Sequence, residues 1–336
     1  MFSILTWNVE NFTKPGEDAD AEAQDLFAQK RDLLAEVIQR DAPDVIAFQE
    51  ILKTEALEAL RDTLGGAWPH LAISTLPDQR GIRVAFLSKL PILEQEDRAD
   101  FPPGPALNVQ NLTLDGAGEP LTRMGRGALR IQVDPGDGPI DCLTLHLKSK
   151  LLSYPPFPGQ GSRFNPRDED ERAQAGGVAL HRRAAEAVTV RLWVNSILEA
   201  HAERPVIVLG DLNDVPEAQT SMLLNGPPGS EIGTGGFHPR DRGDPQRLFN
   251  LAPLIPETER FSRVFRGRGE LLDQILASEE CLPRQDDGKR AVPEVRSRVD
   301  FAHRRIASVS EDPSDRREEV APDHSPVLAR FPFLGA

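Results

Sequence analysis

The order of apolar and polar segments along the chain predicts an α/β sandwich, in which strands and helices pack in layers. Short apolar segments typical of strands alternate with longer amphipathic segments typical of helices, and turn residues separate them. Several apolar segments also end in a carboxylate, an amide or an imidazole, which would gather polar groups at the ends of a sheet. No repeat and no low-complexity linker divides the sequence, so we predict one domain over residues 1–336.

The N-terminal third is predicted to contain two strands and two helices. Ile4–Trp7 is a short apolar strand, and Ala21–Arg40 has apolar residues at near-helical spacing until Pro43 stops the helix. Val45–Phe48 is continuously apolar, which is typical of a strand buried on both faces. A second helix over Lys53–Leu64 ends at two glycines. Further strands are expected at residues 82–87, 107–114, 128–133 and 140–147.

The rest of the chain is predicted to combine long loops with one long helix. Residues 148–172 and 226–247 are rich in Gly, Pro and Arg and follow neither period, so we expect two long loops near the functional site. Ala173–Glu203 is amphipathic at helical spacing, and Val206–Gly210 is the clearest buried strand. The last strands are expected at residues 271–277, 304–309 and 325–330.

Composition limits the classes of function. The formal net charge of −14 argues against binding nucleic acid through a bulk positive field. Carboxylates around a divalent cation would add to this acidic balance, and the bound ion would reverse the potential where a phosphate sits. No apolar segment approaches the roughly 20 residues of a membrane helix, so we expect no membrane span. The first residues alternate as a strand and not as a signal peptide, and Cys142 and Cys281 lack metal-type spacing, so we expect free thiols and a cytoplasmic location.

Asn8 and Glu50 each follow an apolar strand directly. A hard divalent cation such as Mg²⁺ prefers carboxylate and amide oxygens and keeps several waters, so one Glu with one or two further oxygen ligands is enough to bind it. We therefore predict Glu50 as the first metal ligand, with Asn8 beside it. The alternative is an ordinary strand-end turn with a solvated polar residue.

Asp211 and Asn213 follow the clearest strand, and alternation places them on the same side of it. An Asp can take a proton from an attacking water or orient it, and an Asn amide can donate to a developing phosphorane oxygen. An Asx turn that ends the strand is the alternative.

Asp323 and His324 precede the last strand, between two prolines. A histidine positioned by a carboxylate serves as a general base or as a cation that stabilises a phosphate, and we predict Asp273 as the carboxylate that orients His324. The alternative for Asp273 is a turn cap.

His146 ends another predicted strand, and Lys148 and Lys150 follow it, which would suit an anionic substrate. A lone strand histidine is more often structural. Arg126 precedes a strand and could clamp a phosphate; a plain surface Arg is the alternative.

Six segments together resemble the endonuclease/exonuclease/phosphatase superfamily, and they occur in the order of that family over nearly the whole chain. The matching segments are Thr6–Asn8, Ile46–Glu50, Leu145–Leu147, Gly210–Asn213, Leu272–Leu276 and Asp323–Val327. The residues after His146 and those before Asp273 look more like the bacterial nuclease-like members.

The resemblance implies a four-layered α/β sandwich, with two packed mixed β-sheets flanked by helices, and cleavage of a phosphoester by a metal-assisted in-line water. It implies Mg²⁺ or Mn²⁺ as the cofactor. Carried over by position, Asn8, Glu50 and Asp323 lie on the metal side, and Asp211 and Asn213 position the nucleophile and the scissile phosphate. His324 with Asp273 would contact the phosphate, His146 would be a second active-site histidine, and Arg126 would face the phosphate.

Three functional hypotheses follow. The first is a metal-dependent nuclease or phosphodiesterase acting on nucleic acid, because basic residues gather at 148–167 and 260–268. The second is a phosphatase or phosphodiesterase for a small molecule or a lipid headgroup. The third is a binding module on a degenerate scaffold, which the intact set of acid, base and ligand types argues against. We expect a monomer.

Overall fold

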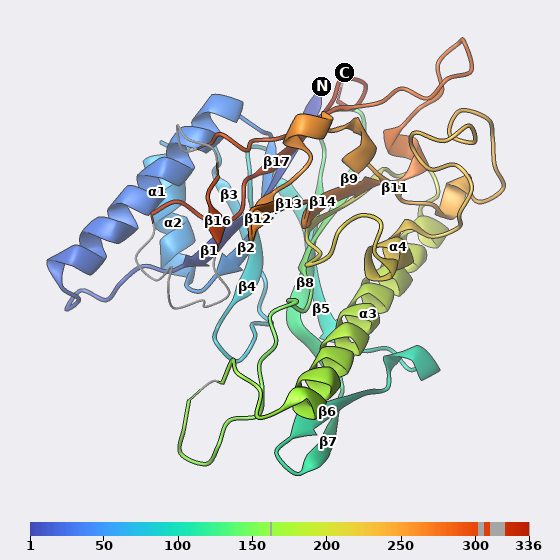
Figure 1. The fold of residues 1–336 in the computed structure, drawn as a ribbon. Coiled ribbons are helices and arrows are strands. Elements are labelled where there is room, and N and C mark those ends of the chain that lie inside the picture. The colour runs from blue at the N-terminus through green and yellow to red at the C-terminus, as the bar shows by residue number, and fades with distance from the viewer. Residues whose placement is uncertain (162, 302–305, 310–319, 336) are drawn as a thin grey trace.

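Two six-stranded sheets pack face to face between helices in the computed structural model of the chain (Figure 1). The structure describes residues 1–161, 163–301, 306–309 and 320–335. Helices α1 (Ala21–Asp41) and α2 (Thr54–Thr63) lie on one side of the sheets, and α3 (Glu169–Ala200) and α4 (Gln219–Asn225) lie on the other. The predicted four-layered α/β sandwich with two mixed sheets is therefore confirmed.

The first sheet has the strand order β15-β17-β1-β2-β4-β3. Its strands span Glu294–Ser297 (β15), Val327–Phe331 (β17), Phe2–Phe12 (β1), Val45–Ile51 (β2), Arg83–Ser88 (β4) and His70–Ile73 (β3). Strands β1 and β2 run parallel at its centre, and their neighbours β17 and β4 run antiparallel to them.

The second sheet has the strand order β11-β14-β10-β9-β8-β5. Its strands span Phe249–Asn250 (β11), Asp273–Ala277 (β14), Val206–Asp211 (β10), Ile140–His146 (β9), Arg123–Val133 (β8) and Ile92–Asp100 (β5). Strands β9 and β10 are again a parallel central pair between antiparallel neighbours. Each sheet therefore directs the carboxyl ends of two adjacent strands to one edge.

Two smaller sheets complete the fold. One pairs β6 (Val109–Thr113) with β7 (Gly116–Leu121), and the other has the order β13-β12-β16. The latter strands span Arg268–Glu270 (β13), Arg263–Phe265 (β12) and Ser308–Val309 (β16). Of the strand predicted at 304–309, residues 304 and 305 lie outside the described part.

Strand β2 shows how the sequence produces the layers. Val45 and Ala47 belong to the apolar cluster between the sheets, whereas Ile46 and Phe48 belong to the cluster under α1 and α2. A third cluster lies between the second sheet and α3. Because successive residues of a strand point to opposite faces, a strand that packs on both sides must be continuously apolar. Burial of β2 on both faces is thus confirmed.

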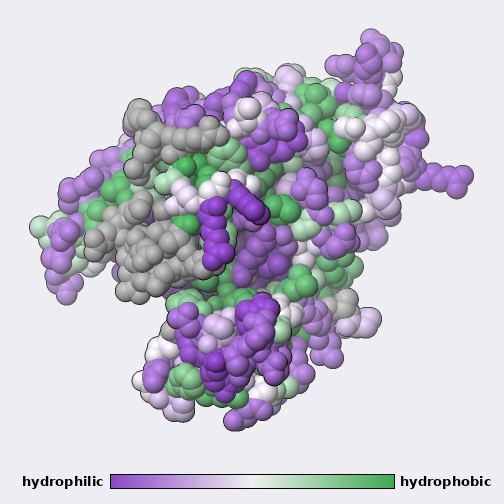
Figure 2. All heavy atoms as spheres, in the orientation of Figure 1, coloured by the Kyte–Doolittle hydropathy of each residue, from purple (hydrophilic) through white to green (hydrophobic). Residues whose placement is uncertain are grey.

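The β6–β7 pair projects from the sandwich beside the N-terminal half of α3. Leu107 and Val109 pack on Ala185 of α3. In Figure 2 this part of the molecule appears as a lobe set off below the main body. The lobe has its own small apolar cluster and does not enlarge the central core.

Two of the local differences between prediction and structure have clear physical causes. Helix α3 begins at Glu169 and not at Ala173, because the Asp168 side chain accepts a hydrogen bond from the backbone N–H of Glu171 and so caps the helix. Strand β5 was not predicted, because Ile92–Asp100 is a charged edge strand with one exposed face and lacks the apolar pattern of its neighbours.

Within the part of the chain that the structure describes, no helix has the length and apolar character required to cross a bilayer. Cys142 and Cys281 are both buried and free, which confirms the prediction of unpaired thiols.

Candidate active site

Polar side chains from both sheets meet where the central strands end. Asn8 lies within β1, where the register with β2 shifts between Asn8 and Phe12, and Glu50 is one residue before the end of β2. His146 and Asp211 are the last residues of β9 and β10. In the second sheet, Asp211 stands opposite His146 on one side and opposite Asp273 on the other. The strand registers therefore bring four separate segments of the sequence to one place.

Direct contacts join the two sheets at this edge. The Nδ2 atom of Asn8 donates to Asp211 Oδ2 at 3.0 Å and to Glu50 Oε1 at 3.3 Å. The Nε2 atom of His146 lies 3.3 Å from Asp211 Oδ2 and 4.0 Å from Glu50 Oε1. Two carboxylates thus face each other across one amide and one imidazole.

Unusual backbone conformations aim these side chains. Glu50 has φ +66°, and Glu10 and Asn11 both have φ +49°, so three non-glycine residues near the site adopt the left-handed region. The bend lets the Asn11 N–H donate to Glu50 Oε2 at 2.9 Å and the Glu10 N–H donate to Asn8 Oδ1 at 3.1 Å. Non-glycine residues held at positive φ cluster at functional sites, where surrounding contacts maintain the strain.

His324 pairs with Asp273, as predicted. His324 Nδ1 lies 2.6 Å from Asp273 Oδ2, and both residues are buried. The indole N–H of Trp7 donates to the His324 carbonyl at 2.9 Å, and the hydroxyl of Ser262 accepts from the Asp273 N–H at 3.0 Å. The pair is therefore fixed from both sheets.

The two histidines differ in charge. Burial alone would lower the pKa of His324, but the carboxylates of Asp273, Asp323 and Asp211 outweigh it and raise this pKa to about 10. Burial, with the nearby positive charges of Arg126 and others, lowers the pKa of His146 well below its ordinary value. His324 is therefore an imidazolium at neutral pH, and His146 is a neutral imidazole.

Asp211 is a carboxylate of raised basicity. Burial raises its pKa to about 6, although the charge of His324 acts in the opposite direction. Its Oδ1 accepts from the backbone N–H of Asn213 at 2.8 Å, and Asn213 has φ +52°. The Asn213 side chain donates from Nδ2 to the Leu147 carbonyl at 3.0 Å, which ties the end of β10 to the residues after β9.

Asp323 lies beside His324 and Glu10. Its Oδ2 is 3.4 Å from Arg263 Nε, its Oδ1 is 4.0 Å from His324 Nε2, and its N–H donates to Glu10 Oε2 at 3.1 Å. These contacts connect Asp323 to His324 and, through Glu10, to Asn8. A ligand role for Asp323 stays a prediction.

Arg126 is buried behind the site. Its Nη1 donates to the carbonyls of His146 at 3.4 Å and Leu147 at 3.3 Å, and its Nε lies 3.4 Å from Asp78 Oδ2. These contacts hold the end of β9 and identify Arg126 as a residue that positions His146. A contact with substrate phosphate stays a prediction.

Lys148 and Lys150 begin the loop after β9. Lys148 Nζ donates to two carbonyl groups of its own loop, both at 3.0 Å. Lys150 Nζ lies 3.2 Å from Asp214 Oδ1 and 3.4 Å from Glu270 Oε1, with 39% of its side chain exposed. Lys150 is thus the more accessible of the two to a substrate.

The two predicted loops lie in different places. Residues 148–168 leave directly from the site. The expectation that 226–247 also lies near it is wrong. That loop leads into β11, where Phe249 pairs with Ala277. Strand β14 begins at Asp273, beside the site, and Ala277 is at its other end. Buried ion pairs of Asp244 with Arg247 and Arg290 hold the loop there.

Glu186 of α3 was not recognised in the sequence. Its carboxylate is buried and accepts from the N–H groups of Gly125 at 2.9 Å and Lys148 at 2.6 Å, and from Arg182 Nε at 3.1 Å. It therefore ties β8 and the loop after β9 to the helix. A charged residue within a long helix gives no sequence signal for such a role.

Gln49 was also assigned no role. It is buried between the sheets, and its Nε2 donates to Thr6 Oγ1 at 3.1 Å and to Thr144 Oγ1 at 3.0 Å. Since Thr144 lies on β9, this amide links the two sheets directly beneath the site.

The donor set fits a hydrated divalent cation. The Asn8 amide lies between Glu50 and Asp211, and Glu50 and Asn8 together offer a carboxylate and an amide oxygen of the kind that a hard cation prefers. Among the described residues no group of three or more His, Cys, Asp or Glu side chains is arranged to enclose a metal ion. Mg²⁺ and Mn²⁺ match a site of few protein oxygens and several waters, whereas structural Zn²⁺ takes four protein ligands.

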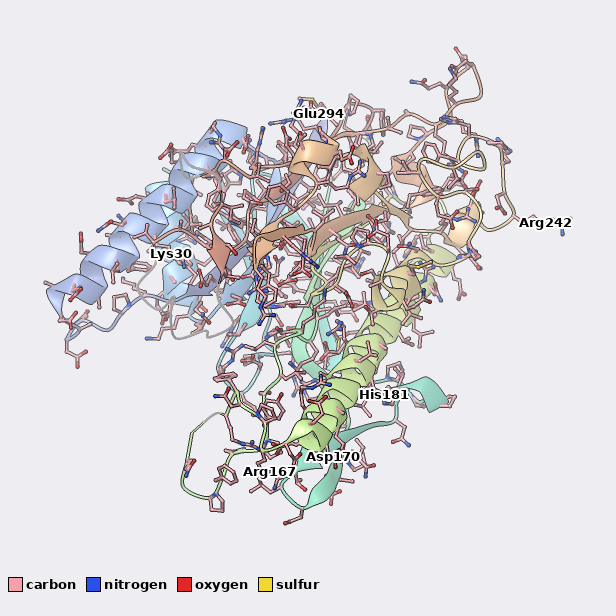
Figure 3. All side chains as sticks on the ribbon, in the orientation of Figure 1. Lys30, Arg167, Asp170, His181, Arg242 and Glu294 are labelled. Atoms are coloured by element: carbon pink, nitrogen blue, oxygen red, sulfur yellow. The ribbon has the colours of Figure 1, made fainter. Side chains whose placement is uncertain are left out.

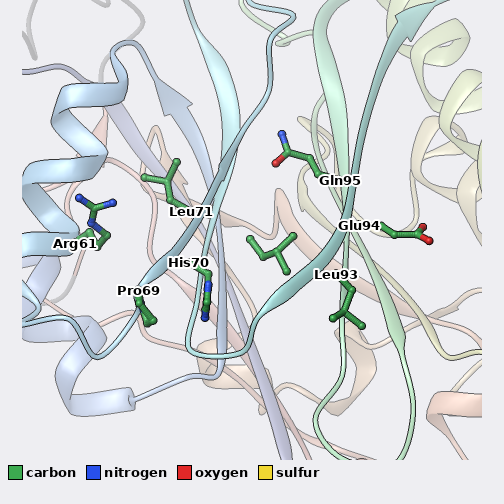
Figure 4. A pocket seen from close by; sticks show the side chains of 8 residues that line it. Arg61, Pro69, His70, Leu71, Leu93, Glu94 and Gln95 are labelled. Atoms are coloured by element: carbon green, nitrogen blue, oxygen red, sulfur yellow. The ribbon is translucent and has the colours of Figure 1, made fainter.

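A groove of about 630 Å³ lies elsewhere, between the edges of the two sheets (Figure 4). His70 and Leu71 line it on one side, and Leu93 and Glu94 on the other. His70 pairs with Ser88, and Ser88 pairs with Val45 at the start of β2, whereas Glu50 lies near the end of β2. The groove is thus distant from the titratable cluster.

Comparisons with known proteins agree with the fold. The Endonuclease/Exonuclease/phosphatase family matches residues 5–315. A sequence search against curated proteins finds no match. Among solved structures, truncated TDP2 from Caenorhabditis elegans has a TM-score of 0.56 at 15% identity, with 98% of this chain and 97% of that chain covered.

Two further structures are similar in fold. Sphingomyelinase C from Streptomyces griseocarneus has a TM-score of 0.52 at 14% identity, with 98% of both chains covered. Humanised TDP2 from D. rerio has a TM-score of 0.53 at 14% identity, also with 98% of both chains covered. At these identities the similarity establishes the fold alone.

Proposed function

We propose that this chain, which belongs to the Endonuclease/Exonuclease/phosphatase family, is a divalent-metal-dependent phosphodiesterase that cleaves nucleic acid. As a member of that family it is a phosphoester hydrolase. The observation that carries the proposal is the convergence of Asn8, Glu50, His146 and Asp211 beside the His324–Asp273 pair.

Mg²⁺ or Mn²⁺ would be held by Glu50 and Asn8, and when bound would polarise a phosphoryl oxygen and offset negative charge. Asp323 is the third proposed ligand. The Glu50 carboxylate is the partly exposed member of the cluster, with 17% of its side chain accessible. A partly exposed carboxylate suits an ion that retains waters.

Asp211 is proposed as the group that orients the attacking water and takes its proton at Oδ2. A pKa of about 6 leaves this carboxylate mostly ionised at neutral pH yet more basic than an ordinary Asp. Asn213 assists by donating its backbone N–H to Asp211 Oδ1, which holds the carboxylate in one orientation.

His324 and His146 are proposed to act on the phosphate in different ways. With a pKa of about 10, His324 cannot serve as a general base at neutral pH, so its Nε2–H stabilises charge on the phosphoryl oxygens as a cation. Asp273 keeps it charged and oriented through Nδ1. His146, being neutral, donates a hydrogen bond from Nε2 without adding charge.

The substrate is proposed to be a polynucleotide because basic residues border the site. Lys150 lies beside Asp214, and Arg263 lies beside Asp323. Phosphodiesters of small molecules or lipid headgroups would undergo the same chemistry at phosphorus. The printed name of sphingomyelinase C identifies a lipid substrate for that protein only.

Hydrolysis assays test the proposal. We expect the protein with Mg²⁺ or Mn²⁺ to hydrolyse bis(p-nitrophenyl) phosphate and to nick supercoiled plasmid, and to lose both activities on chelation. Asp211→Ala should reduce the rate by roughly 100-fold or more, the scale of general-base catalysis. Hydrolysis of sphingomyelin or an inositol phosphate with intact plasmid would favour the alternative substrate, and metal-independent activity would contradict the mechanism.

A monomer and a cytoplasmic location remain predictions. Size-exclusion chromatography with light scattering, and fractionation of cells that produce the protein, test them.

A further inference from the structure

We propose that the β12–β13 hairpin is a platform that binds one base and the adjoining phosphates of a single-stranded polynucleotide beside His324. This inference rests on the proposed function and names the form of its substrate. We define the hairpin by residues 263–270, which connect the two strands through the turn Arg266-Gly267.

Backbone contacts join the hairpin to the His324–Asp273 pair. The backbone of Arg263 forms a bridge with His324, and the Ser325 N–H donates to the Ser262 carbonyl at 2.7 Å. The Ser262 hydroxyl accepts from the Asp273 N–H. The hairpin therefore cannot move independently of the imidazolium, and a ligand on it would lie next to the reacting phosphate.

The composition of the hairpin contrasts with that of the whole protein. The chain carries a formal net charge of −14, yet hairpin residues 263–270 include three arginines and one acidic residue, Glu270. Arg263 is 3.4 Å from Asp323, and the side chains of Arg266 and Arg268 lie at the surface. A local positive surface on an acidic protein is what a phosphate backbone would require at this edge.

An aromatic ring lies among these charges. The guanidinium carbons of Arg263 and Arg266 lie 5.7 Å and 5.6 Å from the centroid of the Phe265 ring, and Phe265 is partly exposed. Aromatic rings and guanidinium planes are the two surfaces on which proteins stack unpaired bases. A duplex keeps its bases stacked internally, so this arrangement favours a single strand.

The turn holds Arg266 in a conformation that arginine seldom adopts. Arg266 has φ +48° and Gly267 has φ +75°, the sign pattern of a type I′ turn, where Asn or Gly is the usual first residue. Arginine at this position has a conformational cost, and strained residues of this kind accompany functional sites. The substitution Arg266→Asn is therefore informative, since it removes the positive charge and also relieves the backbone strain.

The hairpin does not have the character of a membrane-inserting loop. None of the large hydrophobic side chains that are exposed among the described residues belongs to it; the exposed set includes Leu93, Phe164 and Met222 instead. Its single aromatic ring is bordered by charge. A loop that enters the lipid interface would present apolar side chains at its tip.

Binding of a short fluorescein-labelled oligothymidylate, followed by anisotropy, tests the platform. The experiment uses the full chain with Asp211→Ala to prevent cleavage. We expect Phe265→Leu, which keeps apolar bulk but removes the ring, to weaken binding at least about fivefold. The double variant with Arg266→Asn and Arg268→Ala should lower the slope of log Kd against log salt concentration by about 0.7 for each lost contact.

Arg242→Ala is the matched control. Figure 3 shows Arg242 at the outer edge of the loop 226–247, away from the hairpin. This variant removes one positive charge, as each arginine substitution in the hairpin does, and should bind the oligonucleotide as the parent does. Thermal melting verifies that each variant is folded, and Arg266→Asn is expected to melt no lower than the parent because Asn accepts positive φ.

Three results would overturn the inference. One is equal oligonucleotide binding by the hairpin variants and the control variant. Another is equal competition by an unlabelled duplex of the same composition. The third is that the hairpin variants lose binding only to phosphatidylglycerol vesicles and still bind the oligonucleotide. The proposed function fails separately: if it is wrong, the parent chain with native Asp211 does not hydrolyse bis(p-nitrophenyl) phosphate with metal, whatever the hairpin variants bind.

Discussion

The absence of a side chain at Gly210 lets β10 lie against β9 one residue before Asp211. A Cβ atom there would meet the backbone carbonyl oxygen of Leu145 at 2.0 Å, and Gly210 has φ +145°. Main-chain atoms in the middle of a sheet cannot move aside cheaply. The position of Asp211, the carboxylate proposed to act on the attacking water, therefore depends on this glycine.

We predict that Gly210→Ala lowers the free energy of unfolding by more than about 4 kcal/mol, because a clash is added to backbone strain. Gly136→Ala is the matched control, since Gly136 has φ +123° but no atom within 4 Å of an added Cβ. The control should lose only about 1–3 kcal/mol. Urea denaturation of both variants measures the difference, and equal losses would show that contact with Leu145 is not the cause.

At the same scale, Asp273→Asn should reduce kcat by roughly 10- to 100-fold with little change in KM. Asparagine fills the same space, but it cannot hold the charge on His324 through Nδ1. The rate on bis(p-nitrophenyl) phosphate measures the effect. A kcat equal to that of the native chain would remove Asp273 from the proposed mechanism.

Helix α3 contributes a buried charged side chain, Glu186, to the contacts that hold the loop after β9. Glu186 holds the N–H of Lys148, and burial together with the charges of Arg182 and Arg126 lowers the pKa of Lys148 to about 8. The loop after β9 is thus attached by polar contacts and not by an apolar cluster, and its stability should respond to pH.

The sign follows from proton binding. In the unfolded chain Lys148 has a pKa near 10.5, so between pH 8 and 10.5 the unfolded state binds more protons than the folded state. The contribution of Lys148 to stability therefore rises with pH in this window, by about 1–3 kcal/mol. Urea denaturation of the native chain and of Lys148→Met at both limits isolates it. An identical pH dependence of the two proteins would contradict the prediction.

The elements that position the site were largely predictable from sequence. Asn8, Glu50, His146 and Asp211 each end an apolar segment, and parallel pairing of such strands brings their carboxyl ends together. The His324–Asp273 contact was also predicted, since a histidine needs an orienting carboxylate.

Other features were not predictable, because they depend on neighbours that are distant in sequence. Nothing local indicates that Arg126 is buried against carbonyl groups or that Glu186 caps three donors. The loop 226–247 was misplaced because composition reveals a loop but not the end of the sheet at which it lies. Strand β5 was missed because its charges obscure its pairing with β8.

The thiols of Cys142 and Cys281 lie in the apolar cluster between the two sheets, so their reactivity measures how readily the whole molecule opens there. Burial raises the pKa of Cys281 to about 12 and that of Cys142 well above its ordinary value. We predict that iodoacetamide labels neither thiol in the native protein and both in urea, because the thiolate is the reactive form. Mass spectrometry counts the labels. Rapid labelling of the native protein would show that the layer opens readily.

The central claim is that strand ends from two sheets form one site for a divalent cation. Its most direct test is a titration with Mn²⁺ followed by electron paramagnetic resonance, with Glu50→Gln as the variant and Glu17→Gln, an exposed carboxylate, as the control. We predict that Glu50→Gln weakens Mn²⁺ binding at least about tenfold, the effect of about 1.4 kcal/mol, and that Glu17→Gln leaves it unchanged. Equal Mn²⁺ affinity in all three proteins would contradict the account.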